Sequence, residues 1–395
     1  MNPEYPNIVI GAGPAGLMAA SASTGTCLIL EAGPRPGRKL LLSGSGQCNF
    51  THDLELDEFL KRCGSYARFL KPALYKLSPA KLIGYLNSLG CQSIVRPDGK
   101  VFPASLDAKD VLAALLRGAL KPGNQIISSA RITHVSIDKG FVLTDNHQRL
   151  YRCRKLLIAT GGASWPQTGS DGSGYELARQ LGHKLIEPRP ALASILIDAY
   201  PFRTCAGIAL SGIKAELLTQ AGKHRVSGDL LFTHRGLSGP LVLDHSHLLA
   251  QGDTIRLCYL EDAAVKLRQI MASRPKSSLK NALKTTGLPE ALLLVLITMA
   301  KVNPDKRCAD VSAPELKSLG FSLSSSDLKL KSVECLSTAM LSAGGIDLGE
   351  VRARDMSSCL VPGLYFAGEV LDYNLPTGGF NIQAACSTGF LAGSQ

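Results

Sequence analysis

A short apolar stretch that runs directly into a glycine-rich turn constrains this chain more than any other feature. Residues 7–10, NIVI, are typical of a buried strand, the turn GAGPAG follows at residues 11–16, and a helical pattern comes next. In such a turn Gly11 permits a sharp change of direction, Gly13 lets the backbone approach a diphosphate, and Gly16 lets the helix pack closely on the strand. The pattern therefore predicts a strand–turn–helix unit that binds a dinucleotide.

Glu31 supports the same interpretation, because it ends a second apolar strand at residues 27–30. A carboxylate at this place accepts hydrogen bonds from a ribose diol and repels a 2′-phosphate. The motif fits NAD or the ADP half of FAD. The GSDGSG of residues 169–174 has its glycines in the wrong order and no clear strand before it, so a separate nicotinamide-binding domain is not expected.

The C-terminal end contains a second candidate site. Residues 363–367 are typical of a strand that runs into Gly368 and Glu369, and the TGG of residues 377–379 opens a helix at residues 380–391. The free amides and the dipole of such a helix stabilise the negative charge that a reduced flavin acquires at N1 and O2. Glu369 is then expected to meet ribitol hydroxyls. A glycine turn followed by a packing helix is the structural alternative.

A basic, glycine-rich loop follows Glu31 directly. RPGRK at residues 35–39 precedes SGSGQCN at residues 43–49. Cationic side chains and glycine-exposed amides together favour a site for a diphosphate and a flavin edge. A solvated basic loop is the alternative that this segment leaves open.

Length and composition favour a large globular protein. The 395 residues are 45% hydrophobic and 19% charged, which predicts two or three structural units. The longest apolar run, residues 291–300, is shorter than the roughly 20 residues that span a bilayer, and the first residues lack a basic secretory signal. We therefore expect a cytoplasmic protein without a membrane partner.

Metal and disulfide chemistry are not expected. The eleven cysteines are scattered without a C-x-x-C pair, and His245 and His247 lack acidic or cysteine companions at metal spacing. The GLSG of residues 236–239 does not match a serine hydrolase motif. His234, in the preceding turn, is either a proton donor or a structural histidine.

Changes of pattern divide the chain into four segments. Residues 1–190 carry the first glycine-rich motifs, residues 191–260 predict a β-rich insert, and residues 261–320 predict a small, basic helical insert. Residues 321–395 return through the insert to the first domain, so the two ends of the chain are expected to build one domain together.

Taken together, these stretches resemble a bacterial family of FAD-binding NAD(P)/FAD-dependent oxidoreductases, the aminoacetone oxidase-like flavoproteins. The resemblance covers both ends and the middle of the chain. It implies an α/β fold, in which a doubly wound, Rossmann-like FAD-binding domain carries a β-barrel-like insert and a small helical insert. The matching pieces are GAGPAGLMAA, GRKLLLSGSGQCNFTH, GKVFP, ATGGASWPQTGSDGSGYELARQLGH, LFTHRGLSGP, and GGIDLG through VPGLYFAGEVLDYNLPTGGFNIQAACSTGFLAG.

The resemblance also implies a set of contacts with FAD, with Ile132 near the adenine. The implied FAD-binding residues are Gly11, Ala12, Gly13, Pro14, Ala15, Gly16, Glu31, Ala32, Arg38, Lys39, Ser43, Gly44, Gly46, Cys48, Asn49, Ile132, Thr160, Gly161, Gly162, Gly368, Glu369, Gly378, Gly379, Phe380, Asn381, Ile382 and Gln383.

Three positions depart from the family pattern. The connection between Gly16 and Glu31 is shorter by close to one helical turn. Gln47 stands where the family carries an arginine, which removes a cation beside the flavin site, and His52 stands where an asparagine is usual.

We therefore expect an FAD-dependent oxidoreductase that passes a hydride between flavin N5 and a small organic substrate, with NAD(P)H as the external reductant. The substrate is expected near Cys48, Asn49, His234 and Tyr373, and no catalytic acid is assigned. Cys48 is interpreted as a packed or flavin-edge residue rather than a nucleophile, because no neighbouring base is evident.

Two other functions stay open. The net charge of +11, and a segment between Glu58 and Asp98 that holds seven Lys or Arg, five aromatic residues and no acid, favour an FAD-containing RNA-binding or RNA-modifying protein. Two solvated basic helices explain the same segment without any partner. A flavin-binding sensor without turnover is the third function.

Overall fold

The computed structural model describes residues 4–395 and divides the chain into two compact units. Unit 1 combines the chain up to Ala191 with Cys335–Gln395, and unit 2 is Leu192–Glu334. The two ends of the chain therefore build one unit around a continuous middle segment.

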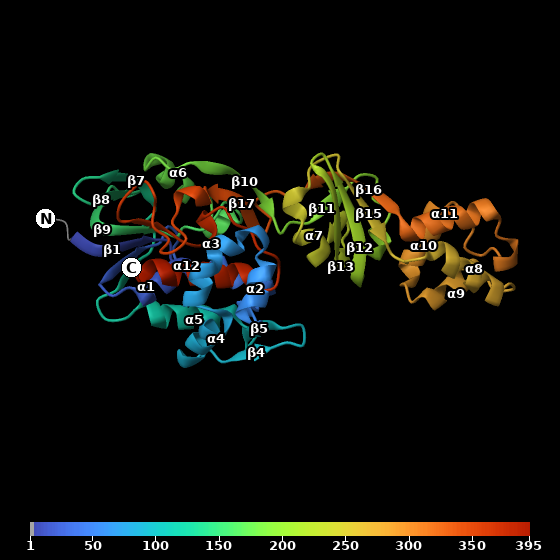
Figure 1. Cartoon of the computed structure of the whole chain (residues 1–395), viewed down its shortest axis with the longest axis horizontal. Coiled ribbons are helices and arrows are strands. Elements are labelled where there is room, and N and C mark those ends of the chain that lie inside the picture. Colours follow the sequence, from blue (N-terminus) through green and yellow to red (C-terminus); the bar gives the residue numbers. More distant parts are fainter. Residues whose placement is uncertain (1–3) are drawn as a thin grey trace. The chain divides into compact units, whose positions relative to one another are not determined.

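A mixed sheet forms the centre of unit 1 (Figure 1). Its strands lie in the order β6-β2-β1-β9-β8-β7, and β18 pairs with the end of β9. Strands β6, β2, β1, β9 and β18 run parallel, whereas β7, β8 and β9 form an antiparallel meander. Strand β2 is buried along its whole length, as in a sheet covered on both faces. The strands are β1 (Glu4–Ile10), β2 (Cys27–Leu30), β6 (Gln125–Ile127), β7 (Ile132–Ile137), β8 (Phe141–Asp145), β9 (Leu150–Ile158) and β18 (Leu364–Phe366).

Helices α1 and α12 approach each other closely because glycines face backbone at their contact. A Cβ atom on Gly389 would lie 2.1 Å from the carbonyl oxygen of Ala15, and one on Gly393 would lie 2.1 Å from that of Ala19. Helix α1 consists almost wholly of apolar or small residues, which is typical of a helix buried on all sides. The helices around the sheet are α1 (Pro14–Ala22), α5 (Ala108–Ala119), α6 (Ser173–Gln180) and α12 (Phe380–Gly393), and a separate antiparallel pair is formed by β10 (Leu185–Ala191) and β17 (Leu341–Ile346).

The basic segment forms three helices rather than the two expected. Gly64, with a φ of +56°, lies between the first and the second, and Pro79 begins the third, where its missing N–H leaves no partner unsatisfied. A small antiparallel sheet flanks these helices in the order β3-β5-β4. The elements are β3 (Thr51–His52), α2 (Leu56–Arg62), α3 (Ala67–Lys76), α4 (Pro79–Ser88), β4 (Ser93–Val95) and β5 (Lys100–Pro103).

Unit 2 combines a closed antiparallel barrel with a group of helices. The strands close in the order β11-β14-β13-β12-β15-β16. Barrel and helices share one hydrophobic core, which includes Ile195 of the barrel and Leu267 and Leu296 of the helices. The elements are β11 (Ile195–Ile197), β12 (Ala209–Thr219), β13 (Gly222–Phe232), β14 (Gly236–Ser238), α7 (Pro240–Leu243), β15 (Thr254–Cys258), α8 (Ala263–Ser273), α9 (Leu279–Leu283), α10 (Glu290–Met299), α11 (Ala313–Ser324) and β16 (Ser326–Val333).

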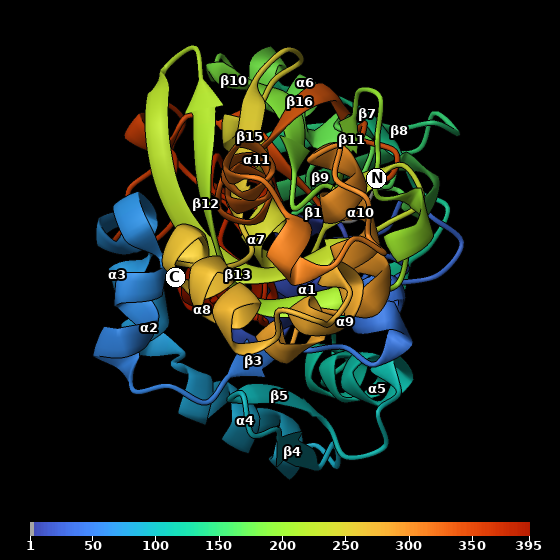
Figure 2. The same ribbon diagram turned by 90° about the vertical axis from the view of Figure 1, so that its right-hand side faces the viewer.

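The predicted fold class is confirmed: an α/β domain carries a closed barrel and helical segments (Figure 2). Within residues 4–395, no helix is long and apolar enough to cross a bilayer. All eleven cysteines are free thiols. In the described part of the chain, no three His, Cys, Asp or Glu side chains are grouped as they would be around a metal ion.

Candidate functional site

The glycine-rich turn of unit 1 has two crowded positions and one open position. The amide of Gly11 donates to the carbonyl of Leu30 over 2.8 Å, and a Cβ atom on Gly11 would lie 2.4 Å from the carbonyl oxygen of Ala159. A Cβ atom on Gly16 would lie 1.9 Å from the carbonyl oxygen of Gly11, whereas one on Gly13 would have no atom within 4 Å. Helix α1 also begins without a side-chain cap. The turn therefore presents open space and uncapped amides, which suit an anionic group.

Glu31 is held in place by the backbone around it. One carboxylate oxygen accepts from the amide of Ala12 over 2.8 Å, and the other accepts from the amide of Gly33 over 2.7 Å. The residue is only 9% exposed. Because an ionised carboxylate has about four lone-pair sites, it can accept further hydrogen bonds from a ribose.

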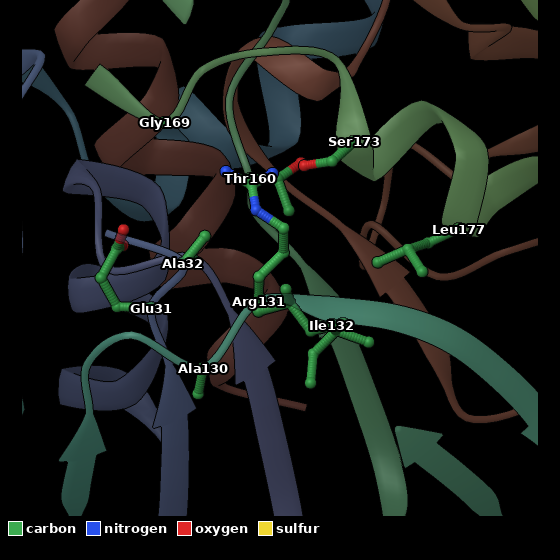
Figure 3. A pocket seen from close by; sticks show the side chains of 11 residues that line it. Glu31, Ala32, Ala130, Arg131, Ile132, Thr160, Gly169, Ser173 and Leu177 are labelled. Carbon is green, nitrogen blue, oxygen red and sulfur yellow. The ribbon is translucent and has the colours of Figure 1, made fainter. Parts of the chain in front are cut away.

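A pocket with about 350 Å³ of free space lies beside this carboxylate (Figure 3). It brings together five residues that the sequence analysis assigned to the cofactor, namely Gly11, Glu31, Ala32, Ile132 and Thr160. The other lining residues, which the sequence analysis did not assign, are Ile10, Ala130, Arg131, Gly169, Ser173 and Leu177.

Arg131 is the charged residue that sequence reasoning missed at this pocket. Its guanidinium lies 2.6 Å from a carboxylate oxygen of Asp171. Burial alone would raise the pKa of Asp171, but hydrogen bonds from Ser173 and Arg131 outweigh burial and hold that pKa below its ordinary value. The only available signal was position, because Arg131 directly precedes Ile132 in the chain.

Lys39 and Glu369 form a partly buried ion pair in unit 1, although 330 residues separate them in sequence. The Lys39 ammonium lies 2.7 Å from a Glu369 oxygen and donates to the hydroxyl of Ser164 over 2.6 Å. Glu369 also accepts from the amide of Ser342 over 3.0 Å. The two residues therefore connect the basic loop with the segment after β18.

The loop before β3 is shaped by left-handed residues. Gly44, Ser45 and Cys48 have φ angles of 55°, 56° and 57°. Cys48 is fully buried, and burial raises the pKa of its thiol to about 12, so the thiol stays protonated at neutral pH. Asn49 donates to the carbonyls of Thr51 and Val101. This geometry agrees with a packed rather than a nucleophilic Cys48.

A cation reaches Gln47 from a different segment. Arg96 donates to the side-chain oxygen of Gln47 over 2.7 Å, and its guanidinium carbon lies 3.8 Å from the ring centroid of Phe102. The positive charge that is absent at position 47 is thus present beside it.

The first turn of α12 is tied to the loop around β3. Gly379 has a φ of +91°, and a Cβ atom there would lie 2.6 Å from the carbonyl oxygen of Thr51. Gln383 is fully buried and accepts from the hydroxyl of Thr51 over 2.6 Å. The helix begins without a side-chain cap. Its first amides are therefore free of a side-chain partner, and their role toward a flavin stays a prediction.

The remaining predicted residues fall on the same elements. Gly368 has a φ of +78° and donates to the hydroxyl of Thr388. The side chain of Ser43 donates to the carbonyl of Leu40. The glycine-rich turn and the first turn of α1 contain Ala12, Pro14 and Ala15. In the basic loop, Arg38 lies beside Gly33 and Gly46 stands near the end. Strand β9 is followed by Gly161 and Gly162, and helix α12 is preceded by Gly378 and begins with Phe380, Asn381 and Ile382.

The four substrate-pocket candidates are divided between the units. Cys48, Asn49 and Tyr373 lie in unit 1 and His234 lies in unit 2. Tyr373 is 2% exposed, and burial raises the pKa of its hydroxyl far above the ordinary value. His234 is exposed in the turn between β13 and β14. Their roles in substrate binding stay predictions.

The sheet order and the pocket define a Rossmann-type α/β protein with the fold of FAD-dependent oxidoreductases. The chain belongs to the family described as HI0933-like protein Rossmann domain, whose model matches residues 5–395. The aminoacetone oxidase-like assignment stays a prediction.

Three relatives match nearly the whole chain. It is 31% identical to a ribosomal RNA dihydrouridine synthase of Escherichia coli, over 98% of this chain and 96% of the relative. It is 32% identical to a protein of the same name from Haemophilus influenzae, over 97% and 96%. It is 28% identical to a 3-dehydro-bile acid delta(4,6)-reductase of Clostridium scindens, over 98% and 97%.

Solved structures of two fumarate reductases share the fold. A flavocytochrome c3 fumarate reductase matches with a TM-score of 0.54 at 14% identity, over 99% of this chain and 78% of that one. The quinol fumarate reductase of E. coli matches with a TM-score of 0.51 at 16% identity, over 100% and 70%.

Proposed function

We propose that this protein is an FAD-dependent oxidoreductase that reduces a carbon–carbon double bond conjugated to a carbonyl group, with NAD(P)H as the reductant. The observation that carries the proposal is the pocket that gathers Gly11, Glu31, Ala32, Ile132 and Thr160, together with the open space at Gly13 in the same glycine-rich turn as Gly11. When bound, FAD supplies transfer of a hydride to the substrate at flavin N5.

The residues of unit 1 would hold FAD at separate places. The uncapped amides of α1 bind the diphosphate, and Gly13 leaves the space for its approach. Glu31, fixed by two backbone amides, accepts from the ribose. The uncapped first turn of α12 stabilises negative charge on the flavin ring.

The substrate class follows from what the named relatives have in common. Formation of dihydrouridine saturates a double bond conjugated to a carbonyl of uracil, and a delta(4,6)-reductase of a 3-oxo steroid saturates double bonds conjugated to its ketone. In both reactions a hydride adds to one carbon and a proton to the other. The named relatives therefore share the type of bond that is reduced, whereas their substrates differ.

The visible spectrum of the purified protein, followed by anaerobic addition of NADH and of NADPH, tests this function. We expect flavin absorption bands that bleach with one of the two donors and recover when an enone is added. Bands that do not bleach would remove NAD(P)H from the proposal. A protein without bands, even after reconstitution with FAD, would contradict the proposal as a whole.

A second candidate function is reduction of a uracil base within RNA. Two observations favour it: the names of the two relatives above 30% identity, and the exposed cations of α2 to α4. Incubation of the reduced protein with ribosomal RNA, followed by nucleoside mass spectrometry, should show uridine that has gained two hydrogen atoms. If no dihydrouridine forms in RNA but the protein reduces a free enone, only the first function remains.

A further inference from the structure

The segment at residues 59–97 has an unusual charge balance, because it holds seven Lys or Arg and neither Asp nor Glu. Lys61, at its edge, is paired with Glu58. Within residues 4–395, the other cations of the segment form no ion pair with a carboxylate. Their positive charge is therefore not neutralised inside the described chain.

One of these cations lies over an exposed aromatic ring, and two more lie close to the same end of α3. Tyr75, on α3, is 51% exposed, and the ammonium of Lys71 lies 5.5 Å from its ring centroid. The ammonium of Lys81 donates to the carbonyls of Tyr75 and Lys76 over 3.0 and 3.3 Å. We call Lys71, Tyr75, Lys76 and Lys81 the Tyr75 surface. Of the five aromatic residues in the segment that sequence analysis grouped together, Tyr75 is the exposed one.

The Tyr75 surface is anchored to α12. Helix α3 packs against α12 (Figure 1), and the carbonyl of Leu77, which follows α3, accepts from Gln383 over 2.9 Å and from Ser387 over 2.7 Å. Gln383 belongs to the first turn of the helix that we expect to face the flavin. The Tyr75 surface therefore belongs to the same compact unit as the cofactor pocket.

An exposed aromatic ring among unpaired cations matches the chemistry of single-stranded nucleic acid. Bases stack on aromatic side chains whatever their sequence, and Lys pairs with the phosphates between them. An acidic protein surface would use the cations but would leave the ring without a matching group. The ring is the feature that favours RNA.

We propose that the Tyr75 surface binds RNA, with a base stacked on Tyr75 and the adjoining phosphates paired with Lys71, Lys76 and Lys81. The proposal rests on the second candidate function and names the surface through which the RNA is held.

Fluorescence anisotropy of a labelled single-stranded oligouridine, titrated with the FAD-loaded full chain over a range of salt concentrations, tests the proposal. We expect Tyr75→Ala to weaken binding by about tenfold or more, and Tyr75→Phe to retain it, because the stacking face is kept. Combined Lys71→Gln, Lys76→Gln and Lys81→Gln should lower the slope of log affinity against log salt by about two, since three phosphate contacts are lost.

The matched control is a second triple, Lys266→Gln, Lys276→Gln and Lys317→Gln, which removes the same charge from exposed lysines of unit 2 that have no ion-pair partner within residues 4–395. It should leave the slope unchanged. Three results would each overturn the proposal. The first is an equal decrease of the salt slope in both triple variants, the second is unchanged RNA affinity in Tyr75→Ala, and the third is displacement of the oligouridine by polyglutamate as readily as by unlabelled RNA. Bleaching of the flavin by NAD(P)H should be the same in all variants, so a failure of RNA binding is distinguishable from a failure of the oxidoreductase function.

Discussion

The substitution Gly13→Ala tests whether a diphosphate approaches the open space before α1, because it adds a single methyl group there. The φ of −83° and ψ of −177° at Gly13 suit any residue, and an added Cβ atom would meet no atom within 4 Å. We expect Gly13→Ala to change the stability of the apoprotein by less than about 1 kcal/mol, because only a glycine cap is replaced. FAD affinity should fall by about tenfold or more, because the methyl group occupies the approach path of the diphosphate.

Flavin fluorescence titration and thermal unfolding of the apoprotein separate these two effects. Gly16→Ala is the contrasting variant, because its Cβ atom would lie 1.9 Å from the carbonyl oxygen of Gly11 and should destabilise the fold itself. Normal FAD affinity in Gly13→Ala would show that the diphosphate does not approach this turn.

His183 predicts a pH dependence of stability. Its side chain is fully buried, with Nδ1 3.0 Å from Glu350 and Nε2 2.9 Å from the hydroxyl of Ser358. Burial lowers the pKa of His183, and the nearby Glu350 only partly offsets that effect. The unfolded chain therefore takes up a proton at a higher pH than the folded one, so the free energy of unfolding falls as pH drops below about 6.5.

Urea unfolding at several pH values between about 7.5 and 5.5 checks this sign. In His183→Gln we expect lower stability at neutral pH, because hydrogen bonds in a buried place are disturbed, and a flatter dependence on pH. A variant that keeps the wild-type slope would assign the acid sensitivity to other groups.

At the level of residues, sequence reasoning located the parts of the pocket that lie next to glycine motifs. Gly11 and Glu31 each stand at the end of a predicted strand, so local pattern was enough to place them, and Thr160 followed from the family resemblance. Arg131 and Gly169 could not be found in this way, because they reach the pocket through a meander and a loop whose course depends on tertiary packing. The Lys39–Glu369 pair joins chain segments that no local pattern relates.

At the scale of elements, the contact between α1 and α12 predicts a large difference between two glycine substitutions. Gly389→Ala places a Cβ atom 2.1 Å from the backbone of Ala15, so the two helices must separate. We expect a loss of about 1–3 kcal/mol in the free energy of unfolding, with weaker FAD retention. Gly84→Ala, on the exposed side of α4 with no atom within 4 Å, should stabilise by about 0.5–1 kcal/mol.

Urea unfolding compares the free energies of unfolding of Gly389→Ala and Gly84→Ala. The two variants are matched because each adds one methyl group to a helix. Equal effects on stability would mean that the α1–α12 contact is looser than its geometry indicates.

The elements themselves were predictable where the pattern was local. The helix α12 was expected from the turn glycines that precede it, and it is confirmed. The division of the basic segment into three helices was missed, because the turn at Gly64 adopts a left-handed conformation without a flanking proline. The pairing of β18 with β9 joins Leu364 to Leu156, and such a long-range pairing leaves no local trace in either strand.

At the scale of the whole molecule, unit 2 has the features of an insertion that folds by itself. Its ends are adjacent, since the amide of Glu334 donates to the carbonyl of Ser194 over 2.9 Å and Ile195 pairs with Val333. Its barrel is closed, so it leaves no unpaired sheet edge, and its core is continuous from strands to helices.

We therefore expect residues 192–334, expressed alone, to fold with a cooperative urea transition and without flavin. Unit 1, with Ala191 joined to Cys335 by a short Gly/Ser linker, should retain FAD, because every residue assigned to the cofactor belongs to it. Circular dichroism of the first fragment and the flavin spectrum of the second check the two halves of the prediction. A disordered 192–334 fragment would show that the barrel depends on unit 1 for its stability, and loss of flavin from the joined unit 1 would place part of the cofactor site in unit 2.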